Sequence, residues 1–268
     1  MRHKNYKHEV AENFMRNEKG QVAIFVIVAL IIVAIILILL FYPKIPFIQP
    51  SAEVSPISFL KSCTAPEIKM QVKELADKGG YRNPEGNLTY GGEAIKYLCY
   101  TAENYKTCVV QQPLIKENFE KELNAIMKNK ISECVDSLKQ EYEKRGYDVS
   151  LSRSDAKVSF NPGNILVSIS SPMTVKKEES SKSFSGFNIE MESQMYDLLM
   201  LSVSIVDYEA TYGDSETTLY MQYYPDLKIE KIRLSEGSKI YRLTNVITNE
   251  TFSFASRSLV WPQGYGLE

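Results

Sequence analysis

The chain contains 268 residues, 44% of them hydrophobic and 24% charged, and it carries a formal net charge of −2 at pH 7. Binding to nucleic acid requires a concentrated basic surface that displaces counterions from phosphates. After the first 20 residues Lys and Arg are mixed with a similar number of Asp and Glu, so we expect no nucleic-acid partner.

A run of 20 consecutive apolar residues extends from Val22 to Phe41. As an α-helix rising 1.5 Å per residue it would be about 30 Å long, which matches the hydrocarbon core of a bilayer. The run is longer than the apolar core of a secretory signal peptide, and no small-residue cleavage site follows it. We therefore predict one transmembrane helix over residues 21–42, with the lipid bilayer as its partner.

Basic residues are concentrated before this helix, whereas only Lys44 lies close behind it. Cytoplasmic flanks of membrane helices are enriched in Lys and Arg. The asymmetry predicts a single-pass protein of the cell membrane, with residues 1–20 as a cytoplasmic tail and the C-terminal part outside. The basic residues before the helix are Arg2, Lys4, Lys7, Arg16 and Lys19.

Four prolines between residues 43 and 56 prevent a continuous helix and predict an extended, Pro-rich spacer. Residues 57–268 follow as an extracytoplasmic domain, long enough to bury a core. A candidate sub-boundary lies near residue 146, where the apolar period changes from helical to alternating.

All four cysteines lie on the exported side, and this even count favours two disulfides, for which three connectivities exist. A two-residue turn at residues 103–104 would place Cys99 directly opposite Cys108 on paired strands, within disulfide range. By elimination Cys63 would then pair with Cys134. The rival interpretation is a zinc site made by the four thiols, but the spacing contains no Cys-x-x-Cys pair.

Three stretches show the apolar period of an amphipathic helix. The first starts with Pro66 in its first turn and stops at two glycines, residues 79–80. The second runs from about Pro113 to Arg145 and has the clearest apolar stripe. The third covers residues 189–213, although part of it alternates as a strand would.

Alternating apolar and polar residues predict short antiparallel strands in two blocks, residues 147–177 and residues 227–258. Residues 81–92 read as a polar loop before the proposed hairpin. Helices and strand blocks in this order predict an α+β fold, in which amphipathic helices pack on antiparallel sheets after a single N-terminal transmembrane helix.

Catalytic groups are sparse outside the membrane, because both histidines, His3 and His8, precede the apolar run. Ser58 and Lys61 match the Ser-x-x-Lys of penicillin-interacting serine enzymes, but the companion motifs are missing. We therefore predict that the protein is not an enzyme and binds no cofactor or metal. The alternative is a hydrolase that uses Ser58 and Lys61, or a pair of carboxylates, for catalysis. The candidate carboxylates are Glu190, Glu192, Asp197 and Asp207.

Two N-glycosylation sequons begin at Asn87 and Asn249, both in predicted turns on the exported side. The sequence also has 17 tyrosines, and Tyr220, Tyr223 and Tyr224 cluster before a proline. Such a cluster suits contacts with carbohydrate or protein, and the alternative is a set of aromatic anchors at the edge of the core.

The stretch "EKGQVAIFVIVALII" resembles the class III signal sequence of archaeal type IV pilin-like proteins, and the resemblance covers residues 16–42. It implies processing between Gly20 and Gln21 by a prepilin-peptidase-like enzyme, so that residues 1–20 would be a cleavable leader. Many pilins carry a glutamate at the fifth mature position, where this chain has Phe25. The prolines after the apolar run also differ from the continuous helical spine of a filament.

These observations predict a membrane-anchored cell-surface protein whose extracytoplasmic domain serves binding or envelope structure. Its expected partners are other envelope or surface proteins, or glycans. One alternative is a minor pilin-like filament subunit processed after Gly20. The other is the envelope hydrolase described above.

Overall fold

The computed structural model describes residues 25–37, 54–152 and 155–260. The chain divides into two units, residues 1–53 and residues 54–268. In the first unit residues 25–37 form an α-helix with exposed side chains. Among the described residues, no helix combines the length and the apolar character that crossing a membrane requires. The ends of the predicted segment 21–42, both histidines, and Gly20 and Gln21 lie outside the described residues, as does most of the spacer.

Helix α2, Pro56–Asp77, begins ten residues before the predicted start, so Pro66 lies inside the helix and not in its first turn. The correction follows from local chemistry: Pro56 occupies a first-turn position, and the Ser55 hydroxyl accepts a hydrogen bond from the Ser58 amide at 3.4 Å. The helix ends as predicted. Gly79 has φ of 77°, and the Gly80 amide donates to the Leu75 carbonyl at 2.8 Å, which is a Schellman-type stop.

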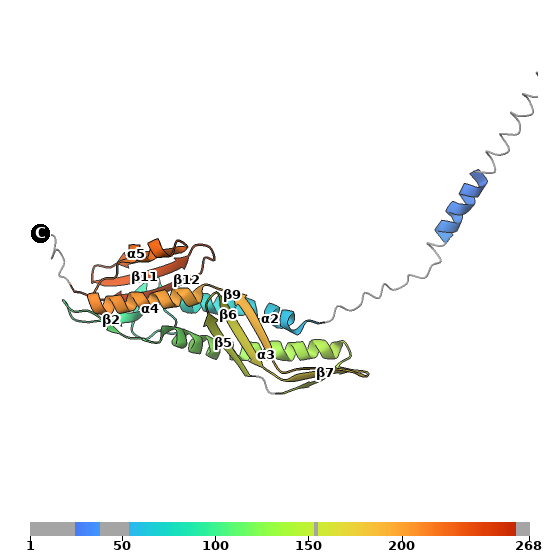
Figure 1. Cartoon of the computed structure of the whole chain (residues 1–268), viewed down its shortest axis with the longest axis horizontal. Helices are drawn as coiled ribbons and strands as arrows, with labels where there is room; N and C mark the ends of the chain where they lie inside the picture. Colours follow the sequence, from blue (N-terminus) through green and yellow to red (C-terminus); the bar gives the residue numbers. More distant parts are fainter. Residues whose placement is uncertain (1–24, 38–53, 153–154, 261–268) are drawn as a thin grey trace, which may run out of the picture. The chain divides into compact units, whose positions relative to one another are not determined.

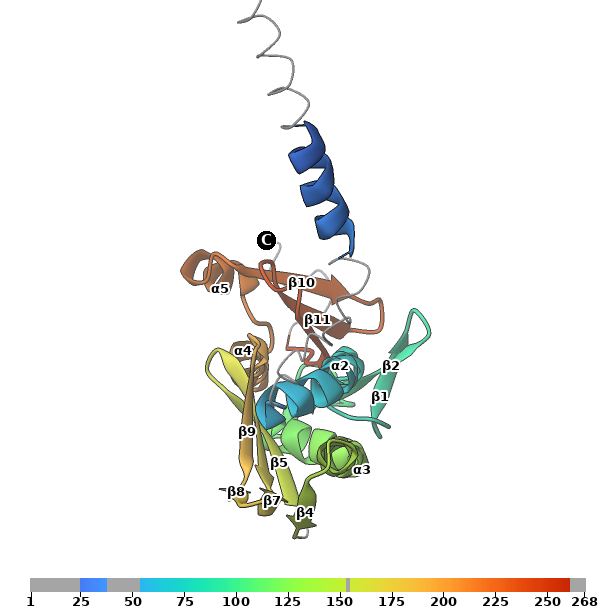
Figure 2. The ribbon, with the colours of Figure 1, turned by 90° about the vertical axis from the view of Figure 1, so that its right-hand side faces the viewer.

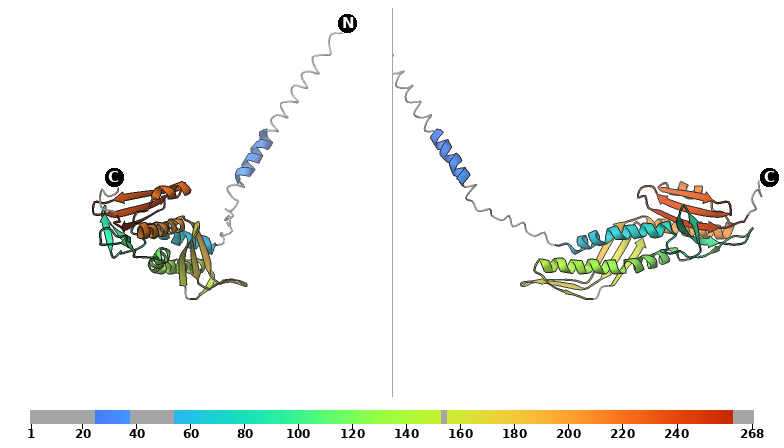
Figure 3. Two further views of the ribbon diagram at one scale, coloured as in Figure 1. Left: turned by 60° about the vertical axis from the view of Figure 1, so that its left-hand side comes forward. Right: turned by 180° about the vertical axis from the view of Figure 1, so that it is seen from behind.

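Helix α3, Ile115–Lys144, confirms the predicted long amphipathic helix, and it runs side by side with α2 (Figure 3). A disulfide between Cys63 and Cys134 joins the two helices, as predicted. The buried stripe includes Leu123, Met127 and Ile131, because positions four residues apart remain on one face. The buried residues of α3 are Ile115, Phe119, Leu123, Met127, Ile131, Cys134, Val135, Leu138 and Tyr142.

Two antiparallel sheets of three strands follow α3, in the orders β4-β7-β8 and β5-β6-β9. The predicted strands are present, but two further strands were not predicted. Strand β8 lies after the predicted block, and β9 was missed because residues 189–192 were assigned to a helix. In β9 the residues with odd numbers are buried and the others exposed, which is the alternation of a strand. The bounds are β4 Asp148–Leu151, β5 Asp155–Asn161, β6 Asn164–Ser170, β7 Met173–Lys177, β8 Ser180–Phe184 and β9 Phe187–Glu192.

The largest sheet has the order β1-β2-β12-β11-β10, with β3 paired to β2. Strands β10, β11 and β12 form the predicted meander, but β12 pairs with β2 in parallel, so the sheets are not all antiparallel as expected. The predicted loop at residues 81–92 contains strand β1. The bounds are β1 Asn87–Tyr90, β2 Glu93–Tyr100, β3 Val109–Val110, β10 Leu227–Arg233, β11 Ser238–Asn245 and β12 Thr251–Arg257.

The second disulfide joins Cys99 and Cys108, again as predicted, but the strand register that led to it was wrong. In β2 and β3 Cys99 pairs with Val110, two residues beyond the expected partner. The connection is therefore longer than a two-residue turn, and Tyr105 in it has φ of 60°. The bond still forms because Cys108 directly precedes β3, and its Cα lies 5.4 Å from that of Cys99.

Helix α4, Met195–Tyr212, and the short helix α5, Thr217–Tyr223, lie between β9 and β10 in the chain. Figure 2 shows α2 and α4 beneath the sheet that contains β10 and β11. One cluster of buried apolar side chains draws on all three long helices and on the sheets, before and after residue 146. The described residues from Val54 onward therefore pack as one unit.

Candidate functional site

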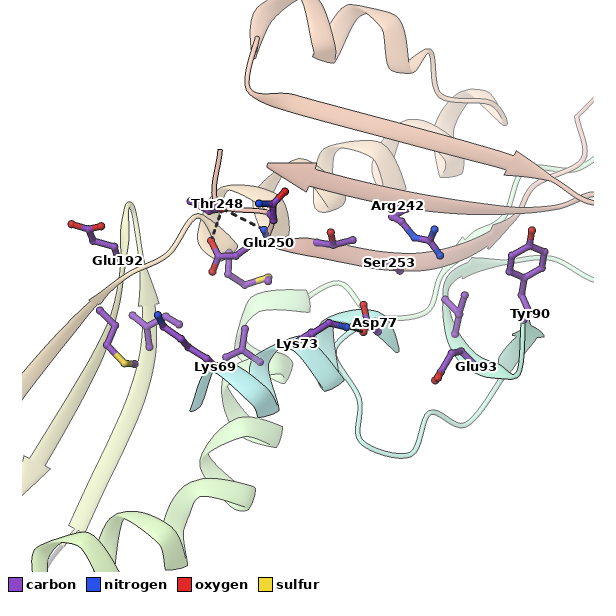
Figure 4. A pocket seen from close by; sticks show the side chains of 18 residues that line it. Lys69, Lys73, Asp77, Tyr90, Glu93, Glu192, Arg242, Thr248, Glu250 and Ser253 are labelled. Carbon is purple, nitrogen blue, oxygen red and sulfur yellow. Dashed lines mark hydrogen bonds and ion pairs between the residues drawn. The ribbon is translucent and has the colours of Figure 1, made fainter. Parts of the chain in front are cut away.

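A cleft with a volume of about 730 Å³ lies between α2 and the turn that joins β11 to β12 (Figure 4). The β1–β2 hairpin and the end of β9 also contribute side chains to it. Its volume is within the 300–1,000 Å³ of typical ligand sites. Elements that are distant in the sequence thus meet around one concave surface.

The α2 wall is built by helical spacing, because Lys69, Val72, Lys73 and Asp77 are three or four residues apart and share one face. Lys73 Nζ lies 2.6 Å from Asp77 Oδ2, which holds these two charges to each other. Lys69 is exposed and forms no ion pair within the described residues. The wall therefore offers one uncommitted cation to a ligand.

The opposite wall is the β11–β12 turn, and Glu250 fixes its position. One carboxylate oxygen of Glu250 accepts a hydrogen bond from the Ser193 hydroxyl at 2.6 Å, and the other accepts one from the Gln194 amide at 2.5 Å. The Asn245 side-chain oxygen accepts from the amide of Thr248 at 3.0 Å. These bonds tie the turn to the start of α4, so this wall is preorganised.

The floor of the cleft is apolar, whereas both ends are charged. Figure 4 places Glu192 at one end and Arg242 with Tyr90 at the other. Arg242 approaches Glu230 only to 3.9 Å, and Glu192 makes no ion pair within the described part of the chain. The apolar lining residues are Val72, Ile95, Ile165, Met191 and Met195.

An apolar floor with charges of both signs around it has the layout of a protein-binding patch, in which a hydrophobic centre is surrounded by a polar rim. Tyr90 is the single aromatic residue among the lining side chains. The chain matches no known protein family, no curated protein and no solved structure. The assignment of the cleft therefore depends on its own chemistry.

The predicted catalytic candidates do not meet in this cleft as a group. Ser58 and Lys61 lie in the first turns of α2, so the expectation that Ser58 precedes the helix was wrong; both are exposed and share no hydrogen bond in the described structure. Of the four candidate carboxylates, Glu192 alone lines the cleft. Glu190 lies on the outer face of β9, and Asp197 and Asp207 are exposed on α4.

The described residues contain no cluster of three or more His, Cys, Asp or Glu side chains arranged for a metal ion. The rival interpretation of the cysteines as a zinc site is wrong, because all four thiols are consumed in the two disulfides.

The two sequons occupy different local structures. Asn249 lies in a turn as predicted, is exposed with φ of 57°, and lines the cleft. Asn87 is the first residue of β1 and not a turn residue, and its amide nitrogen donates to the Pro84 carbonyl at 2.8 Å. No residue in the described part of the chain bonds the acceptor nitrogen of Asn249, whereas that of Asn87 is already bonded.

A buried charged residue, Glu209 on α4, was not predicted from the sequence. It is fully buried and lies 2.6 Å from Lys239 Nζ on β11. Its carboxylate also accepts hydrogen bonds from the hydroxyl groups of Tyr241 and Ser256 and from the Ser215 amide. The contacts with Lys239, Tyr241 and Ser256 join α4 to the large sheet, and the contact with Ser215 joins α4 to the loop after it. None of these residues lines the cleft, so the network positions structural elements.

Two ionisation equilibria reflect this environment. Burial, reinforced by the adjacent Glu209 carboxylate, raises the pKa of Tyr241 far above its usual range, so the phenol stays protonated and donates. Partial burial opposes the ionisation of Asp214, but the hydrogen bond from Lys231 and the charge of Lys239 outweigh it and lower the pKa of this carboxyl. Lys231 and Lys239 of the large sheet are thus paired with acidic groups from the last turn of α4 and the loop after it.

Proposed function

We propose that this protein is a membrane-anchored surface protein whose extracytoplasmic domain binds a segment of another envelope protein in the cleft between α2 and the β11–β12 turn. The observation that carries the external location is that all four cysteines form disulfides. Disulfides persist in oxidising compartments and are rare in the cytosol. The uniformly apolar run before the domain and its basic flank support the anchor and the orientation.

The orientation predicts that protease added to intact cells expressing the full chain degrades the domain while a cytosolic marker protein stays whole. In parallel, alkylation of the freshly isolated chain should find no free thiol before reduction. A domain that survives the protease until the cells are lysed, or that carries free Cys63 and Cys134 in vivo, contradicts the external location.

Binding in the cleft is supported by three features of its lining. Burial of the apolar floor by a ligand would release water and favour binding, and the charged ends would orient the ligand. The Glu250 bonds hold one wall in place before any ligand arrives, which reduces the entropy lost on binding. The near balance of cations and anions favours a mixed polypeptide surface over a uniformly charged polymer.

We expect a photo-crosslinking amino acid in place of Lys69, at the cleft, to give discrete protein adducts on intact cells. The matched control is the same substitution at Lys121, an exposed lysine on α3 that does not line the cleft. Changing Arg242→Glu at the far end of the cleft should weaken the Lys69 adducts at least fivefold. Equal adducts from both positions, or none from Lys69, contradict binding in the cleft.

A further inference from the structure

A second concave surface lies between α4 and the α5–β10 segment. It has a volume of about 480 Å³, and we call it the tyrosine groove after Tyr220, Tyr223 and Tyr224, which line it. It shares no lining residue with the cleft of Figure 4. Figure 1 shows α5 as a short helix next to the β10–β11–β12 meander. Its lining also includes Gln194, Asp197, Ser204 and Asp226.

Two of the three tyrosines are exposed at the groove, whereas Tyr220 packs against the core. Tyr223 is 81% exposed and Tyr224 is 53% exposed, and α5 contains no buried residue at all. Tyr220 is half-buried, and its hydroxyl is hydrogen-bonded to Ser204 on α4 at 2.9 Å, which fixes α5 against α4. An exposed aromatic ring leaves apolar surface in contact with water, which is unfavourable. A ligand that stacks on the ring would remove that surface from water.

Polar groups around the rings are uncommitted. Among the described residues, none donates to or accepts from the side chains of Gln194, Asp197 and Asp226, and none bonds the hydroxyls of Tyr223 and Tyr224. Amide groups and carboxylates beside one another bind adjacent hydroxyl groups, because they combine donors with strong acceptors. Aromatic planes next to such groups match a sugar ring, which has an apolar face of C–H groups and an edge of hydroxyls.

The charge of the groove restricts the sugar. Its lining includes two carboxylates, Asp197 and Asp226, but no Lys, Arg or His. An anionic sugar would lose water from its charged group without forming an ion pair with a basic side chain, and both carboxylates would repel it. A cationic ligand is disfavoured by geometry, because aromatic cages for cations enclose the charge, whereas Tyr223 faces solvent over most of its surface.

We propose that the tyrosine groove binds a neutral oligosaccharide, through stacking on Tyr223 and Tyr224 and hydrogen bonds to Gln194, Asp197 and Asp226. This site is independent of the occupant of the cleft. It assigns the domain a second ligand class, so the cleft would engage a protein segment and the tyrosine groove a glycan.

The test uses the full chain in a detergent without a sugar headgroup, exposed to immobilised hexasaccharides of glucose, mannose, galactose and N-acetylglucosamine. Hexamers of glucuronic acid and of glucosamine provide the charged counterparts. We expect at least one neutral hexamer to bind and both charged hexamers to bind at least tenfold more weakly. The double variant Tyr223→Ala, Tyr224→Ala should weaken the neutral ligand at least tenfold, while the double Phe variant stays within threefold.

The matched control is Tyr212→Ala, which removes a tyrosine of similar exposure, 63%, from α4 outside the groove and should leave binding unchanged. Because the altered side chains are exposed, circular dichroism should show the same fold in every variant. Binding of no neutral hexamer, preference for a charged one, equal loss with Tyr212→Ala, or occupation of the groove by a protein overturns the proposal.

Discussion

Replacing Glu209 with glutamine is expected to lower the free energy of unfolding by about 3 kcal/mol, because it removes one charge of a buried pair and leaves the buried Lys239 with the more exposed Asp214 as its remaining acidic partner. Glutamine keeps one oxygen, so its NH₂ group would face either Tyr241, which donates to Oε1, or Ser256, which donates to Oε2, and one of these hydrogen bonds would be lost. For a domain of this size the melting temperature should fall by about 6–12 °C. Urea and thermal unfolding of the full chain in detergent measure both quantities.

The control is Asp207→Asn, which removes a carboxylate from the exposed face of the same helix and should change stability by less than about 0.5 kcal/mol. Combining Glu209→Gln with Lys239→Met removes both charges and should cost less than the sum of the single changes. If Glu209→Gln behaves like Asp207→Asn, or if the two effects simply add, the buried pair does not couple α4 to the sheet.

Glu209 shows what sequence analysis can and cannot find. It follows Ile205 by four residues and Val206 by three, so it lies on the buried stripe of α4, and that position was a usable indication of an unusual charge. Its partner was not detectable, because Lys239 lies 30 residues later on a strand. The pairing of a helix with one particular strand depends on tertiary packing, which no local period reports.

The cleft illustrates the same limit in another form. The lysines on α2 share a helix face, and their spacing could have been read from the sequence. The opposite wall depends on Glu250 reaching Ser193 and the start of α4, a contact over 57 positions of sequence. Long amphipathic helices and strand meanders were predictable, because the spacing of apolar residues along the sequence is enough to identify each of them. Strand β9 was missed because six alternating residues directly precede a helix, and the boundary depends on contacts made by Ser193 and Gln194.

Removing the disulfide between α2 and α3, with Cys63→Ala and Cys134→Ala, is expected to cost about 4 kcal/mol. The bond closes a loop with a sequence separation of 71, and loop-closure entropy in the unfolded chain grows with the logarithm of that length. Removing the other disulfide, with a separation of 9, should cost about 2.7 kcal/mol by the same relation. Urea unfolding of the full chain under non-reducing conditions measures the two losses.

The comparison separates two origins of stability. Cys99 and Cys108 are both buried, and the Cys108 amide donates to the Ser258 hydroxyl beside the Glu209 network, so their removal also disturbs packing. If loop entropy dominates, the Cys63–Cys134 variant is the less stable one. The reverse order would mean that the short disulfide acts mainly through the native contacts around it, and would contradict the expected ranking. Both double variants replace cysteine with alanine. The difference between their free energies of unfolding therefore reports the two bonds and their surroundings.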